Sequence, residues 1–298
     1  MEKIDALDWV SRDLYDILGK AVLVRSTSEQ FAAEAARMLR GFQLVRTARE
    51  MDVMLSFHVG QPSQVQTIRP YHFAYNNYAQ TVRSTDYWAL HRQLEVQIDK
   101  TVSDMVSDRL LLHSAVVGRD GGAIVMAGEP GRGKSSVCLE LVLRGYDYYS
   151  DEIASISFDD GRVSPFAKAV GLHDLSLWPD IASDTSKWVG PAVRPAEAGE
   201  KPTWHVHPED LRPGCTGRPA PVRYIVFPEY MQGATPKLER MSGPEAMTGL
   251  LGAVVNAREA GRPALHAVAG LVRNAQLYRL TSNSLDSAAG LIEEMIGA

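Results

Sequence analysis

Two apolar runs of strand length lie next to each other in the middle of the chain, at residues 110–118 (LLLHSAVVG) and 122–128 (GAIVMAG). The residues between them, Arg119-Asp120-Gly121-Gly122, have the composition of a tight turn. This pattern predicts a β-hairpin of two largely buried strands.

The pattern changes from strand to helix directly after the hairpin. Residues 134–145 (KSSVCLELVLRG) have helical spacing of apolar positions, and Gly145 is placed to end the helix. Residues 146–158 (YDYYSDEIASISF) then read as one strand. We expect this strand to run beside the strand at 122–128, as in a strand–helix–strand unit.

The remainder of the chain continues as a mixture of both element types. Ser242-Gly243-Pro244-Glu245 forms a capping box that opens a helix. Further strands are predicted at 222–230 and 276–283, and helices at 243–256, 262–275 and 284–297. Residues 179–221 are proline-rich and have no sustained period, which predicts a long irregular segment of the kind that forms lids or binding loops.

The first third of the chain reads as a separate α/β lobe. Strands are predicted at 21–26 and 51–60, and a helix capped by Ser28 at 28–42. We therefore predict an N-terminal α/β lobe at 1–105, with no role assigned, and a second lobe at 106–298.

A phosphate-binding motif connects the second apolar run to the following helix. Residues 128–136 (GEPGRGKSS) match G-x-x-x-x-G-K-[ST]. Glycines allow backbone N–H groups to approach phosphate oxygens, and a helix N-terminus favours an anion. The motif predicts a triphosphate site in which Lys134 bridges the β and γ phosphates and Ser135 holds Mg²⁺. The predicted binding residues are Gly128, Glu129, Pro130, Gly131, Arg132, Gly133, Lys134, Ser135 and Ser136.

An acidic pair, Asp151-Glu152, follows Lys134 within the next predicted strand. A carboxylate close to the γ-phosphate can take the proton of an incoming hydroxyl, which is the role of a kinase base. We assign this role to Asp151. Glu152 is predicted to support it through Mg²⁺ or its waters, so the predicted metal partners are Ser135, Asp151 and Glu152.

The segment from residue 111 to residue 152 resembles the catalytic core of HPr kinase/phosphorylase and its relatives. The resemblance rests on a histidine strand, a hairpin, the phosphate loop, a helix ending in Arg144-Gly145 and the acidic pair. Later segments resemble HPr-kinase-related proteins, some of which phosphorylate lasso-peptide precursors. The resemblance implies a P-loop kinase core of HPr kinase/PEP carboxykinase type, with Asp151 as the catalytic aspartate and His113 lining the active site.

The chain departs from the family at two points. The family's acidic pair is commonly Asp-Asp, and the glycine-rich second signature of HPr kinases is replaced by SPFAKAVGLHD at residues 164–174. The resemblance therefore supports forward phosphoryl transfer, and these departures leave the reverse phosphorylase activity, the HPr substrate and the hexameric assembly without support. Within the replacement segment, Lys168 is the candidate for contact with the substrate.

Composition limits the cellular location and the binding partners that we expect for this protein. The 298 residues are 45% hydrophobic and 22% charged, as in ordinary globular proteins, and a net charge of −5 is opposite to that expected of a nucleic-acid-binding protein. There are two cysteines and no apolar run of membrane-spanning length. We expect a cytoplasmic protein without membrane or nucleic-acid partners, and homo-oligomerisation stays open.

These observations favour an ATP- and Mg²⁺-dependent kinase, with GTP also allowed, that phosphorylates a serine hydroxyl of a peptide or small protein. Two alternatives remain at this stage. One is a kinase of a small molecule such as free serine or a sugar, and the other is a nucleotide-binding regulator without transfer activity.

Overall fold

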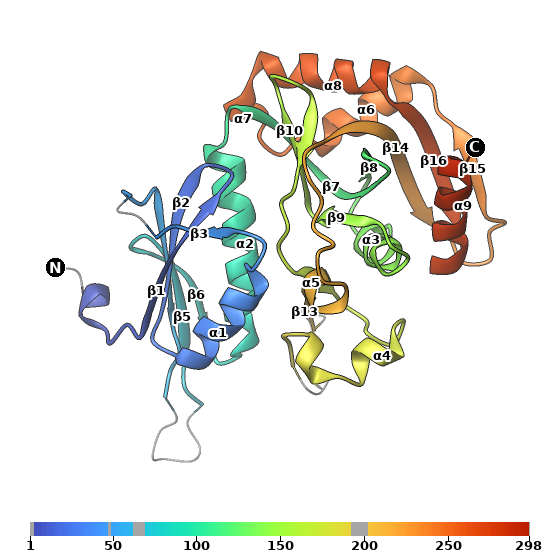
Figure 1. Cartoon of the computed structure of the whole chain (residues 1–298). Helices are drawn as coiled ribbons and strands as arrows, with labels where there is room; N and C mark the ends of the chain where they lie inside the picture. The colour runs from blue at the N-terminus through green and yellow to red at the C-terminus, as the bar shows by residue number, and fades with distance from the viewer. Residues whose placement is uncertain (1–2, 47–48, 62–68, 192–201, 298) are drawn as a thin grey trace. The chain divides into compact units, whose positions relative to one another are not determined.

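The computed structural model of the chain describes residues 3–46, 49–61, 69–191 and 202–297. Residues 192–201 of the segment predicted to be irregular lie outside these ranges. The fold is mixed α/β and divides into two compact units, residues 1–105 with 173–205, and residues 106–172 with 206–298 (Figure 1). Within the described residues, no helix combines the length and apolar character that crossing a membrane requires.

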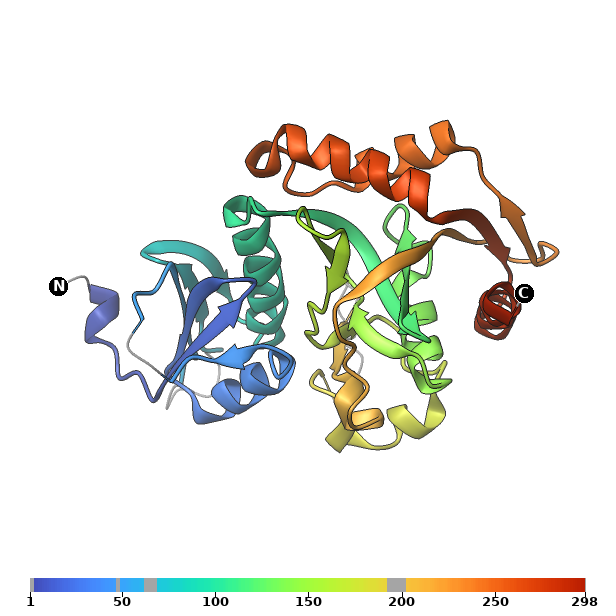
Figure 2. The ribbon, with the colours of Figure 1, turned by 45° about the horizontal axis from the view of Figure 1, so that its top comes forward.

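The first unit is built on a six-stranded sheet with the order β3-β1-β2-β4-β5-β6. Its helices α1 (Glu29–Met38) and α2 (Trp88–Met105) cover one face of the sheet (Figures 1 and 2). The predicted Ser28 cap is confirmed, because its side chain accepts the N–H of Phe31. The strands are β1 (Ser11–Ile17), β2 (Lys20–Ser26), β3 (Gln43–Leu44), β4 (Val53–His58), β5 (His72–Asn76) and β6 (Ala79–Ser84).

Aromatic rings join the two helices to the sheet. Phe31 of α1 packs on Phe57 of β4 with ring centroids 4.8 Å apart, and on His91 of α2 at 4.9 Å. All three side chains are buried. Such packing of large rings contributes more than the area they bury, so α1 and α2 are fixed to the same face of the sheet.

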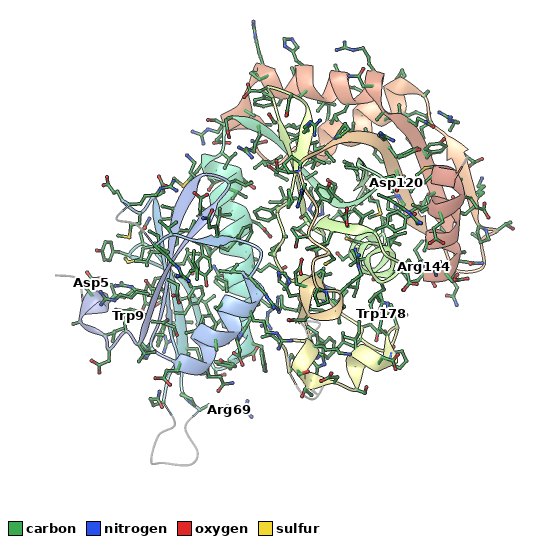
Figure 3. All side chains as sticks on the ribbon, in the orientation of Figure 1. Asp5, Trp9, Arg69, Asp120, Arg144 and Trp178 are labelled. Atoms are coloured by element: carbon green, nitrogen blue, oxygen red, sulfur yellow. The ribbon has the colours of Figure 1, made fainter. Side chains whose placement is uncertain are left out.

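The N-terminal segment of the unit closes over one buried arginine. The guanidinium of Arg25 lies 4.2 Å from the ring centre of Trp9, and it forms a 3.0 Å ion pair with Asp5 of the short helix η1 (Lys3–Ala6). Arg25 also donates to Ser56 at 2.8 Å. Figure 3 labels Asp5 and Trp9, which lie on the side of the sheet away from α1 and α2. The buried charge is therefore paired and hydrogen-bonded, as burial of a cation requires.

The irregular segment predicted at 179–221 is only partly irregular. It contains α4 (Pro179–Ala182), η2 (Thr185–Lys187), β13 (Trp204–Val206) and α5 (Pro208–Leu211). The described residues 173–191 and 202–205 group with the first unit. Arg37 donates to the carbonyls of Trp188, at 3.3 Å, and Ser186. A further contact joins His205 to Glu95 at 3.2 Å.

The second unit is built on an eight-stranded sheet with the path β11-β10-β7-β8-β14-β16-β15, and β9 also pairs with β7. Strand β14 lies between β8 and β16 and runs parallel to both. One further strand, β12 (Val170–Leu172), ends the first of the two chain segments of this unit, residues 106–172. The sheet strands are β7 (Arg109–Arg119), β8 (Gly122–Ala127), β9 (Asp147–Ser150), β10 (Ile153–Ser157), β11 (Arg162–Ser164), β14 (Ala220–Tyr230), β15 (Lys237–Arg240) and β16 (Gln276–Ser282).

The predicted hairpin is confirmed, and it corrects the expected position of the next strand. Arg119 pairs with Gly122, and the turn residues Asp120 and Gly121 have φ of 51° and 71° (Figure 3 labels Asp120). Because the hairpin places β7 against one edge of β8, and β14 occupies the other, the acidic segment cannot run beside β8. It pairs with β7 instead, and as two strands, β9 and β10, rather than the single strand predicted.

Helices cover both faces of this sheet. Alternate residues of β7, including Leu110, Leu112 and Val116, join a core with α6 (Gly243–Ala253) and α8 (Arg262–Asn274). Figures 1 and 2 show α3 (Lys134–Leu143) on the opposite face. The short helix α7 (Ala257–Ala260) precedes α8, and α9 (Leu285–Gly297) ends the unit. The cysteines Cys138 and Cys215 are free and buried.

Two polar anchors hold the elements of this unit in place. Arg144, at the end of α3, forms ion pairs with Glu140, and with Asp286 and Glu293 of α9 at 2.7 and 3.2 Å (Figure 3 labels Arg144). The second anchor is Asn256, which is fully buried. Its Oδ1 accepts the N–H of Leu111, and its Nδ2 donates to the carbonyls of Val106 and Arg109, at 2.8 to 3.0 Å.

Replacement of Asn256 by Ala should destabilise the second unit. The substitution leaves three buried backbone groups at the start of β7 without the amide, at a cost of about 2–4 kcal/mol. Urea unfolding followed by circular dichroism measures this free energy. Asn283→Ala is the control, because Asn283 is exposed and makes one such bond, to Ala234. Equal effects of the two substitutions would contradict the anchoring role.

A buried histidine makes the first unit sensitive to acid. His91 Nε2 lies 2.8 Å from Glu34, which also accepts from Tyr87, while His91 Nδ1 has no hydrogen-bond partner among the described residues. Burial lowers the pKa of His91 below 6.5, an effect that the nearby His205 increases and Glu34 opposes. Protonation would place a charge on an almost fully buried ring, and the interactions with Glu34 and with the backbone of Tyr87 offset this cost only in part.

We expect the free energy of unfolding to fall as the pH decreases from 7.5 to 5.5. A lowered folded-state pKa means that the folded protein binds fewer protons than the unfolded chain, so this stability is present above pH 6.5 and is lost as the pH falls through the folded pKa. The loss is about 1.4 kcal/mol for each unit of pKa depression. Urea unfolding should show a smaller pH dependence for His91→Gln and an unchanged one for the exposed His266→Gln. A wild-type pH dependence in His91→Gln would refute the assignment.

Candidate active site

The phosphate loop occupies the turn between β8 and α3, in the strand–turn–helix context that the motif requires. Gly128, Gly131 and Gly133 have φ of 151°, 80° and 88°, values that residues with a side chain rarely adopt. Gly133 is the N-cap of α3, so the first N–H groups of this helix open toward the loop. The backbone conformation thus explains the glycines, and it gives the loop the form of an anion site.

Lys134 is folded back onto the loop. Its side chain is 6% exposed, and Nζ donates to the carbonyls of Gly128 at 2.7 Å and Glu129 at 3.1 Å. Burial lowers the pKa of Lys134, and the negative charges of Glu152 and Asp151 act against this shift. The acidic pair is therefore within electrostatic reach of the loop's lysine.

The acidic pair is presented by a hydroxyl-closed turn between β9 and β10. Ser150 Oγ accepts the backbone N–H groups of Glu152 at 3.1 Å and Ile153 at 2.9 Å, a local pattern that competes with continued strand pairing. On β7, Val116 pairs with Ser150 and His113 with Ile153. The two acidic residues therefore lie opposite Ser114 and Ala115, in the interruption between β9 and β10.

Asp151 is buried and held on both carboxylate oxygens. Its side chain is 2% exposed, its Oδ2 accepts the N–H of Gly171, and its Oδ1 accepts the hydroxyl of Tyr148, both at 3.3 Å. The same hydroxyl lies 2.8 Å from the carbonyl oxygen of Lys168. Burial, aided by the charge of Asp151, raises the pKa of Tyr148, so the phenol remains protonated and can donate.

Glu152 turns toward solvent on the other side of the same turn. Its Oε1 lies 2.9 Å from Nδ1 of His113, and the two side chains are 33% and 27% exposed. The backbone carbonyl of Glu152 also accepts the N–H of Ser114 on β7. The structure thus brings His113 and Glu152 together, with Asp151 buried beside them.

The other predicted residues lie in the phosphate loop, in the first turn of α3 and in the segment after β11. Arg132 points to the β14 side of the loop, where it forms 3.0 Å ion pairs with Glu229 and Glu129. Ser135 and Ser136 are half-buried in the first turn of α3, and Pro130 and Gly131 form the exposed tip of the loop. Lys168 is 3% exposed, and its contact with a substrate stays a prediction.

The donors around the loop are suited to magnesium. Ser135, Asp151 and Glu152 offer hydroxyl and carboxylate oxygens, which Mg²⁺ prefers. Among the described residues no group of three or more His, Cys, Asp or Glu side chains is arranged to hold a metal by itself. Magnesium sites of kinases commonly complete their coordination with substrate phosphates and water, so the predicted ligand set fits a metal that arrives with a nucleotide.

Sequence analysis missed several residues that build the site. The predicted site did not include Tyr148, Ser150, Gly171 or Glu229. The hydroxyl of Tyr148 in an apolar strand was a usable signal for a polar contact, because a buried phenol needs a hydrogen-bond partner. Gly171 and Glu229 carry no signal in the sequence, since their role depends on chain segments far from the motif.

Comparison with solved structures identifies a distant structural neighbour. No family model and no curated protein matches the chain. The HPr(Ser) kinase/phosphatase from Coxiella burnetii is similar at 10% identity and a TM-score of 0.31, over 63% of this chain and 93% of that chain. A TM-score of this size does not establish a shared fold, so the predicted HPr-kinase type of core stays a prediction.

Removal of the Tyr148 hydroxyl should cost stability at the acidic turn. Tyr148→Phe removes the single phenolic hydrogen that the carbonyl of Lys168 and Oδ1 of Asp151 share, and we expect a loss of about 1–3 kcal/mol in the free energy of unfolding. Tyr278→Phe removes a hydroxyl that donates to the exposed Gln276. This substitution should change the free energy of unfolding by less than about 0.5 kcal/mol. Urea unfolding of both variants checks this, and a neutral Tyr148→Phe would contradict the hydrogen bonds described.

Proposed function

We propose that the chain is a phosphotransferase that moves the γ-phosphate of ATP, or of GTP, to a hydroxyl group with Mg²⁺ present. One observation carries the proposal. The strand β7 holds the phosphate-loop strand β8 on one edge and the turn with Asp151 and Glu152 on the other. A buried carboxylate beside a triphosphate loop is the arrangement that hydroxyl activation requires.

The residues divide the work as follows. The loop amides and the N-terminus of α3 bind the phosphates, and Lys134 exchanges its two loop carbonyls for phosphate oxygens. Asp151 takes the proton of the attacking hydroxyl, with its orientation set by Tyr148 and Gly171. When bound, Mg²⁺ supplies charge neutralisation on the phosphates, and Ser135, Asp151 and Glu152 would hold it.

For the acceptor, we propose a serine hydroxyl on a peptide or small protein, including the terminal serine of a lasso-type precursor. The sequence resemblance supports this class of acceptor. The partly open position of the His113–Glu152 pair is compatible with it, since these side chains line the exposed side of the acidic turn. Assignment of the protein to the cytoplasm and the absence of nucleic-acid partners likewise remain proposals from composition.

Labelled phosphate transfer tests the proposal. Wild-type protein, γ-labelled ATP and Mg²⁺ are incubated with precursor-like peptides ending in serine, with the same peptides ending in alanine, and with free serine. We expect label on the serine-ended peptides only. Asp151→Asn should lower the rate about 100-fold or more, because general-base catalysis contributes this much.

Asp159→Asn is the matched control, because Asp159 is exposed at the far end of β10. It should transfer at the wild-type rate. Full transfer by Asp151→Asn would remove Asp151 from the role of base. Label on free serine would indicate a small-molecule kinase, and transfer to no hydroxyl acceptor, with nucleotide still bound, would indicate a regulator.

A further inference from the structure

A cavity of about 440 Å³ opens beside the phosphate loop, on the side opposite the acidic turn. One wall is the loop itself, at Gly128, Glu129 and Arg132. The others come from the end of β14, from α6 and from β16, all in the second unit. Its volume is within the range of pockets that enclose small molecules.

The position of this cavity in the sheet limits what it can receive. Strand β8, which leads into the phosphate loop, has β7 on one side and β14 on the other. The carboxylates that would meet an attacking hydroxyl lie on the β7 side, and the cavity lies on the β14 side. Attacking and leaving groups stand roughly in line across a transferred phosphoryl group. If the acceptor arrives from the β7 side, the leaving half of the donor extends toward the cavity.

The floor of the cavity is apolar and includes an aromatic ring. Phe227, Pro228 and Met241 contribute to it. The ring of Phe227 lies so close to α6 that a Cβ on Gly249 would come within 2.5 Å of its Cε1. A glycine at this position therefore lets the ring lie directly against the helix, and Phe227 supplies an aromatic side chain to the cavity lining.

The charges at the rim are paired and slightly negative in sum. Arg132 is bonded to Glu129 and Glu229, and Arg279 lies 3.5 Å from Glu245. The lining holds these three glutamates and two arginines, a net charge of −1. Such a rim disfavours a phosphate or carboxylate and suits an uncharged ligand with hydroxyl and amine groups.

We propose that this cavity binds the nucleoside half of the triphosphate donor, with the base against the Phe227 floor and the polar rim around it. This inference rests on the proposed function, because it assumes that the loop holds the phosphates. It assigns the β14 side of the loop to the donor and leaves the β7 side to the acceptor.

Binding measurements with two probes test the inference. Calorimetry in Mg²⁺ compares ATP, which has a nucleoside, with tripolyphosphate, which has none. The variant is Thr248→Trp, because Thr248 lies on the exposed surface of α6 and lines the cavity, where an indole would fill it. Leu251→Trp is the control, since Leu251 is 40% exposed on the same helix and is not part of the lining.

We expect Thr248→Trp to weaken ATP binding about tenfold or more and to leave tripolyphosphate binding unchanged, while Leu251→Trp binds both as the wild type does. Unfolding midpoints of both variants within about 2 °C of the wild type show that the unit is intact. Unchanged ATP binding, an equal loss for both probes, or tripolyphosphate binding as tight as ATP in the wild type would each overturn the nucleoside site. Failure of the wild type to bind either probe would overturn the proposed function itself.

Discussion

Backbone pairing along both edges of one strand is the constraint on which this molecule depends. Strand β7 pairs with β8 from residue 114 to residue 119, and with β9 and β10 on its other edge. Because ladder hydrogen bonds fix register, the end of β8 and the β9–β10 turn come to the same level on opposite edges. The phosphate loop and the acidic turn are placed by this register, and Asn256 secures the strand at its start.

Burial then gives the two carboxylates of the turn different surroundings. Asp151 is enclosed and held by Tyr148 and Gly171, whereas Glu152 is partly exposed beside His113. Fixed orientation suits a group that must meet one hydroxyl in one direction. Partial exposure suits a group that exchanges water or metal contacts. A single turn thus offers two adjacent acids with separate tasks in the proposed reaction.

The charged side chains around the phosphate loop form two groups, one on each side of the loop. On one side of the phosphate loop, Lys134 feels both carboxylates of the turn, and on the other, Arg132 is occupied by Glu129 and Glu229. The free anion-binding capacity therefore lies at the loop amides and Lys134. This distribution favours phosphate at the loop, with uncharged parts of a ligand in the cavity beyond it.

The sequence by itself determined the local features: the hairpin, the glycine-rich turn before α3, the Ser28 and Ser242 caps and most later helices and strands. These depend on neighbours within a few residues, so spacing and turn chemistry are sufficient to predict them. Only the tertiary structure decided that the acidic segment pairs with β7, that the described residues 173–191 and 202–205 group with the first unit, and that Gly171 and Glu229 reach the loop's surroundings. Those contacts join residues far apart in the chain, and strand order and burial, which set them, leave no periodic trace in the sequence.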